Sequence, residues 1–169
     1  MGKTVAFVIA EKDFRDEEYQ IPKEIMEKNG HRVITVSTTL NEAVGKLGMK
    51  VKPDNLITEI NNGAIDGLIF VGGGGSSQYF GDRDAHHLAE KVYDQGKIIG
   101  AICIAPVILA RAGLLKGKKA TVFPDGIKEL ESNGAIYTGA LVEVEGGLIT
   151  GSGPEAAEAF GNKLASMLA

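Results

Sequence analysis

Three short runs of the chain are almost entirely apolar, and each ends in charge or glycine. They cover residues 4–10 (TVAFVIA), 68–75 (LIFVGGGG) and 97–103 (KIIGAIC). A strand with one solvated face alternates polar and apolar residues, whereas a strand buried on both faces has little need of polar ones. These runs therefore predict parallel strands that are covered by helices on both sides.

Segments with helical patterns lie between the apolar runs. Helices are predicted over residues 16–30 and 81–97, within residues 105–117 as far as Gly113, and over residues 153–169. A strand is predicted over residues 31–38, and further short strands within residues 118–152. Residues 38–60 are the least regular part, where a small hairpin is expected. The alternation of strands and helices predicts an α/β fold with a mostly parallel sheet and helices on both faces.

Length and charge narrow the possible partners. The 169 residues fit a single domain spanning 1–169, and no run approaches the ~20 apolar residues that cross a bilayer. A net charge of -4 with scattered Lys and Arg gives no basic stripe for nucleic acid. The lone cysteine cannot form an internal disulfide. We expect a cytoplasmic protein that acts on small molecules.

The single cysteine, Cys103, stands at the end of the third apolar run, just before a segment with Pro106 in its first helical turn. It is either a small core residue or a nucleophile at a strand-to-helix corner. In an open α/β sheet, ligands bind beyond the carboxyl ends of the strands, which favours the second interpretation. The helix dipole would lower the pKa of such a thiol below its free value of ~8.5.

The glycine run at residues 72–75 would share that edge of the sheet. Its N–H groups could form an oxyanion hole or a phosphate cradle, or the glycines could serve only a tight turn. The run lacks the spacing of a dinucleotide-binding or P-loop motif, which disfavours phosphate.

Three acids, Asp16, Glu17 and Glu18, follow the first strand. For at least two of them we expect a solvated position that favours the helix dipole. Glu18 differs because it lies four residues before Pro22, which leaves its carbonyl without a helical donor. A Glu turned inward beside a thiol would have a raised pKa and could donate a hydrogen bond to the sulfur.

Two adjacent histidines, His86 and His87, point to different sides of a predicted helix. We expect them to be mostly exposed, although one could approach the glycine loop. The sequence has no Cys/His cluster for zinc and no G-x-S-x-G elbow, so we predict neither a metal site nor a cofactor.

Several motifs together resemble the ThiJ/PfpI superfamily, which includes PfpI-type intracellular proteases and the Parkinson's-associated deglycase. They are residues 101–121 (AICIAPVILARAGLLKGKKAT), EEYQIP around Glu18, LIFVGGGG and the C-terminal part from residue 133. The resemblance implies a flavodoxin-like three-layer sandwich, a homodimer or larger homo-oligomer, and Cys103 as a reactive thiol with Glu18 as its acidic partner. It also implies that Gly73 and Ile104 donate their N–H groups to an oxyanion.

The chain departs from the superfamily at three places. Ile104 stands where PfpI-type proteases have a histidine, Phe123 stands before Pro124 where deglycase-type members have one, and residues 150–154 lack an arginine common in both. Without an adjacent imidazole, the leaving amine of a peptide has no usual acid, so peptidase activity is the least favoured reading.

The resemblance implies chemistry on small reactive aldehydes, of the glyoxalase III or glycation-repair type. The alternative is an oxidative-stress sensor or chaperone whose Cys103 is oxidised to a sulfinate without turnover. The partner is then an aldehyde or an oxidant. Besides the residues already assigned, the expected pocket residues are Gly72, Gly74, His86, His87 and Phe123.

Overall fold

A seven-stranded sheet forms the centre of the computed structural model, which describes residues 2–169. The strands lie in the order β11-β12-β8-β7-β1-β3-β6, and all pair in parallel except β11, which is antiparallel to β12. In chain order they are β1 (Thr4–Val8), β3 (Arg32–Ser37), β6 (Asn55–Leu56), β7 (Gly67–Phe70), β8 (Ile98–Ile102), β11 (Val142–Glu145) and β12 (Leu148–Gly151). The three apolar runs became β1, β7 and β8 at the centre.

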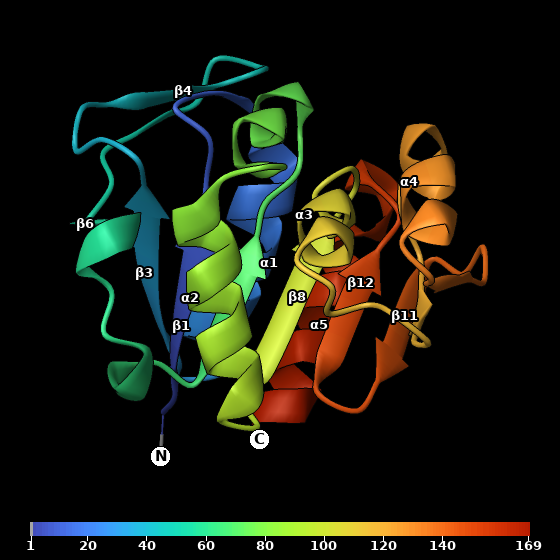
Figure 1. Cartoon of the computed structure of the whole chain (residues 1–169). Coiled ribbons are helices and arrows are strands. Elements are labelled where there is room, and N and C mark those ends of the chain that lie inside the picture. The colour runs from blue at the N-terminus through green and yellow to red at the C-terminus, as the bar shows by residue number, and fades with distance from the viewer. Residues whose placement is uncertain (1) are drawn as a thin grey trace.

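Helices cover both faces of the sheet (Figure 1). They are α1 (Asp16–Lys28), α2 (Arg83–Asp94), α3 (Pro106–Arg111), α4 (Ile127–Ser132) and α5 (Ala157–Leu168). α1 and α5 pack together behind the sheet, where Gly161 of α5 leaves room for Pro22 and Ile25 of α1. α2 and α3 lie on the opposite face. The predicted three-layer α/β architecture is confirmed.

Two small sheets flank the central one. β2 (Lys12–Phe14), β4 (Ala43–Gly45) and β5 (Lys50–Val51) form the first, in which β4 and β5 are the hairpin expected within residues 38–60. β9 (Lys119–Ala120) and β10 (Ile136–Tyr137) form the second. The hairpin lies beyond the carboxyl ends of the central strands, at the top of Figure 1. It therefore stands over the edge at which α/β sheets bind ligands.

The helix expected to run from residue 105 until Gly113 is observed as α3, and the chain turns at Gly113, where φ is +83°. The helix α4 was not predicted at all, because its single short apolar pattern gives no clear period. No helix within residues 2–169 is both long enough and apolar enough to cross a membrane.

Candidate active site

Cys103 lies directly after β8 in a left-handed backbone conformation, with a φ of 66°. Residues other than glycine rarely adopt this conformation, and they do so mainly where the surroundings enforce it. Here the Cys103 N–H donates to the Gly151 carbonyl at 2.8 Å, and the Cys103 carbonyl accepts from Phe123 N at 2.7 Å. The cysteine is only 8% exposed, so a small part of it is open to a ligand.

Glu18 is fully buried on the first turn of α1. Neither of its carboxyl oxygens meets hydrogen-bond geometry with a partner among residues 2–169. A methyl group on Gly72 would lie 2.4 Å from Glu18 Oε1 and 2.6 Å from Cys103 Cβ. The carboxyl and the cysteine therefore meet in the space that the absent side chain of Gly72 leaves.

Burial governs the protonation of this pair. It raises the pKa of the Glu18 carboxyl to about 8, so the carboxyl is mostly protonated at neutral pH. Burial, together with the negative charge of Glu18 once it ionises, raises the pKa of the Cys103 thiol to about 12. The thiol beside a protonated Glu18 escapes that negative charge. Below about pH 8 Glu18 therefore carries a proton that it can donate toward the sulfur.

Two backbone N–H groups act on the same sulfur. Those of Gly73 and Ile104 lower the pKa of the Cys103 thiol, in opposition to burial. Gly73 has a φ of +101°, and a methyl group on it would lie 2.4 Å from the Asp13 carbonyl oxygen. Glycine is thus required for this N–H to reach its position. A negative charge on the sulfur is therefore stabilised by two backbone N–H groups, whereas a negative charge on Glu18 has no donor in hydrogen-bond geometry among residues 2–169.

The prediction that a helix dipole lowers the thiol pKa is wrong in its direction. The helix α3 has six residues and begins at Pro106, beyond the turn that contains Cys103. A short helix at that remove contributes little, because the dipole effect fades within the first turn. Burial dominates instead.

The three acids of α1 have three different environments. Asp16 is buried, and its carboxylate accepts from Leu47 N at 3.0 Å and from Met49 N at 2.9 Å, which fixes the β4–β5 turn. Glu17 is half-buried and pairs with Arg15. The expectation that at least two of the acids are solvated is therefore wrong, because Asp16 and Glu18 are both buried.

A pocket of about 270 Å³ opens above Cys103. Its lining residues are Arg15, Lys46, Gly73, Gly74, Cys103, Ile104, Phe123, Asp125 and Pro154. A larger hollow of about 690 Å³ adjoins it and shares Arg15, Phe123 and Pro154. We place the candidate site in the smaller pocket, because it holds the thiol.

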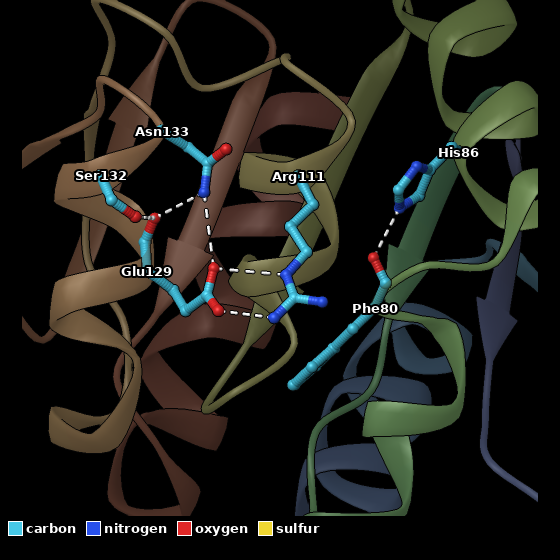
Figure 2. Close-up of polar contacts among 6 residues, drawn as sticks. All are labelled: Phe80, His86, Arg111, Glu129, Ser132 and Asn133. Carbon is cyan, nitrogen blue, oxygen red and sulfur yellow. Dashed lines mark hydrogen bonds and ion pairs between the residues drawn. The ribbon is translucent and has the colours of Figure 1, made fainter.

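The two histidines lie elsewhere. His86 Nε2 is 2.8 Å from the Phe80 carbonyl oxygen (Figure 2), and His87 lines a separate hollow on α2. Figure 2 also shows Arg111, which pairs with Glu129 and lies over the Phe80 ring at 5.4 Å. Neither histidine lines the Cys103 pocket of its own chain, so the expectation that they are pocket residues is not met within one chain.

The structure brings most of the predicted residues together. Gly72, Gly73, Gly74, Ile104 and Phe123 surround Cys103 or its pocket. The sequence analysis missed Arg15 and Lys46, which lie between regular elements, and Asp125, which lies in a short 3-10 helix (Pro124–Gly126). Only Arg15 could have been found from the sequence, because it lies three residues before Glu18 and so close to a residue already assigned to the site.

Comparison with known proteins agrees with this geometry. A model of the DJ-1/PfpI family matches residues 3–167. The uncharacterized protein MJ0967 of Methanocaldococcus jannaschii is 45% identical over 160 residues, which cover 93% of this chain and 78% of that one. Deglycase PH1704 of Pyrococcus horikoshii is 32% identical over 143 residues, covering 84% and 86%. A ThiJ/PfpI domain protein from Brachyspira murdochii superimposes with a TM-score of 0.97 at 29% identity, covering 99% and 96%.

Proposed function

The chain belongs to the DJ-1/PfpI family, and on that premise we propose that it converts small reactive aldehydes through Cys103 and Glu18. The observation that carries the proposal is the buried pair itself. A thiol in an enforced left-handed turn faces a carboxyl that has no other hydrogen-bond partner among residues 2–169. Such a carboxyl is free to move a proton. The name of the relative PH1704, a deglycase, agrees with chemistry of this kind.

For a 2-oxoaldehyde the reaction begins at the sulfur. Sγ of Cys103 bonds to the aldehyde carbon, and the former thiol proton ends on the aldehyde oxygen, which gives a hemithioacetal. The N–H groups of Gly73 and Ile104, which act on the Cys103 sulfur, would donate to the developing negative charge on that oxygen. This first step requires no metal or second substrate.

Glu18 then acts as the proton shuttle. In its ionised form it takes the proton from the carbon bonded to sulfur, and it returns a proton to the neighbouring carbon. The hydroxyl proton on the first carbon passes to the neighbouring oxygen, so the hemithioacetal becomes a 2-hydroxy thioester. Water cleaves the thioester, which releases a 2-hydroxy acid and restores the thiol. The two carbons exchange oxidation level, and no external oxidant is consumed.

A second candidate is redox sensing, and it is favoured by the same unpartnered carboxyl. Each equivalent of peroxide would transfer one oxygen atom to Cys103 and leave as water, first to the sulfenate and then to the sulfinate. A protonated Glu18 would hold a sulfinate oxygen by hydrogen bonding. Peptide hydrolysis is the least favoured candidate, because no histidine lines the pocket among the described residues.

Methylglyoxal turnover tests the proposal. We expect saturable formation of lactate, which Cys103→Ala abolishes and Glu18→Leu lowers at least a hundredfold, as typical of a lost general acid–base. Arg83→Gln, an exposed change on α2, is the control and should keep the wild-type rate. Absence of product together with a peroxide-driven gain of two oxygen atoms on Cys103 would favour the sensor instead.

A further inference from the structure

Two cationic side chains stand at the opening above Cys103. Arg15 and Lys46 both line the pocket of about 270 Å³, and Asp125 is the carboxylate among its lining residues. Arg15 also lines the adjoining hollow of about 690 Å³. Arg15 therefore lies at the boundary of the two hollows, together with Phe123 and Pro154.

Arg15 is held in place by its backbone and by its neighbour. Its N–H donates to the Gly72 carbonyl at 2.9 Å, and a methyl group on Gly73 would lie 2.5 Å from Arg15 N. Its side chain donates from Nε to Glu17 Oε1 at 2.9 Å and from Nη2 to Glu17 Oε2 at 3.0 Å. Nη1 makes no hydrogen bond within residues 2–169, so its two protons remain for a ligand.

Lys46 is positioned as well, although it is exposed. Its N–H donates to the Phe14 carbonyl at 2.9 Å, and Asp16 holds the next residue, Leu47, at 3.0 Å. The Lys46 ammonium forms no ion pair with the described part of the chain. The hairpin therefore presents an unneutralised charge at a fixed place on the pocket rim.

We propose that Arg15 and Lys46 form a carboxylate subsite, so that the preferred substrates are small aldehydes bearing a carboxylate close to the reacting carbonyl. The inference rests on the proposed function, because it assumes that Cys103 is the reacting atom. Planar guanidinium groups suit carboxylates, since two parallel N–H groups match two oxygens. The carboxylates of Glu17 and Asp125 repel an incoming anion. The preference for charged over neutral aldehydes therefore depends on the balance between these two carboxylates and the two cations.

Two alkylating reagents of nearly the same size test the subsite. Iodoacetate carries a carboxylate and iodoacetamide a neutral amide, and with either one Sγ bonds to the methylene carbon as iodide leaves. The readout is the ratio of the two rate constants at Cys103, followed by mass spectrometry. A ratio cancels the fraction of thiolate, which matters because the charge of Arg15 also acts on the sulfur.

We expect Arg15→Gln to lower the iodoacetate-to-iodoacetamide ratio about fivefold, as for a partly exposed ion pair. Glu17→Gln frees Arg15 and should raise the ratio. Arg83→Gln removes the same charge at a residue that does not line the pocket and should leave the ratio within about twofold of wild type. High salt should weaken the preference, because the subsite is open to solvent.

The outcomes separate the two proposals. An unchanged ratio in Arg15→Gln, with Cys103 still labelled by iodoacetamide, overturns the subsite and leaves the aldehyde chemistry standing. The expected ratios without any aldehyde turnover support the subsite and refute the aldehyde chemistry. Failure of both reagents to label wild-type Cys103 overturns both, since the thiol would then be inaccessible.

Discussion

Replacing Glu18 tests whether this carboxyl donates a hydrogen bond to the Cys103 sulfur. Glu18→Leu keeps the volume of a buried residue and removes the donor. A hydrogen bond to a charged group contributes about 1.5–3 kcal/mol, and one pKa unit corresponds to about 1.36 kcal/mol. At a pH below about 8, where Glu18 is mostly protonated, the fraction of thiolate should therefore fall about 10- to 100-fold in Glu18→Leu, and labelling should slow by the same factor.

The assay is the rate of iodoacetamide labelling of Cys103 at a fixed pH below the Glu18 pKa of about 8, where the carboxyl is mostly protonated. Glu18→Gln keeps a donor without a titrating proton, so its labelling rate should lie between those of wild type and Glu18→Leu. Equal rates in all three proteins at this pH would show that the carboxyl does not bond to the sulfur. Faster labelling of Glu18→Leu at this pH would refute the reasoning outright, because Glu18 would then act on the thiol as an anion.

Three further predictions concern stability and packing. The pKa of Glu18 is raised from 4.5 to about 8, so between these pH values the folded state binds a proton that the unfolded state lacks, and the free energy of unfolding should fall as pH rises. Urea titrations at several pH values should show this slope in wild type but not in Glu18→Leu. Gly72→Ala forces a methyl group to 2.4 Å from Glu18 Oε1 and 2.5 Å from the Ile102 carbonyl oxygen, and should cost about 1–3 kcal/mol, seen as a lower Tm; an unchanged Tm would mean that both neighbours move without cost. Asp16→Ala removes the acceptor of two N–H groups and should cost about 1–3 kcal/mol, with faster amide exchange at Leu47 and Met49 but not in β1.

The central sheet could be predicted because its signal is local. The apolar runs at residues 4–10, 68–75 and 97–103 carry it within a few neighbouring residues each, and they form β1, β7 and β8. The helix α4 carries no such signal, because six residues hold less than two helical turns. Its place is set by tertiary contacts, among them the pair between Arg111 and Glu129 in Figure 2.

The site was predictable to the extent that strand ends define it. Cys103 and the glycine run each follow a strand of one parallel sheet, so the fold class alone places them together. The protonation of the thiol was not predictable, because the depth of burial of Cys103 and Glu18 depends on the whole packed domain. The place of Lys46 in the pocket could not be predicted for a different reason. It depends on the hairpin turn that Asp16 holds in position through long-range hydrogen bonds.

The hydrogen bonds that hold the cysteine turn come from backbone atoms of Gly151 and Phe123. Phe123 gives its N–H to the turn, while its side chain, 37% exposed, lines the pocket. The backbone of Phe123 thus holds the cysteine turn, while its side chain helps to determine which molecules fit the pocket. Mutation at position 123 can reshape what enters the pocket while the nucleophile stays where it is, which makes this position a starting point for directed evolution of new substrate preferences.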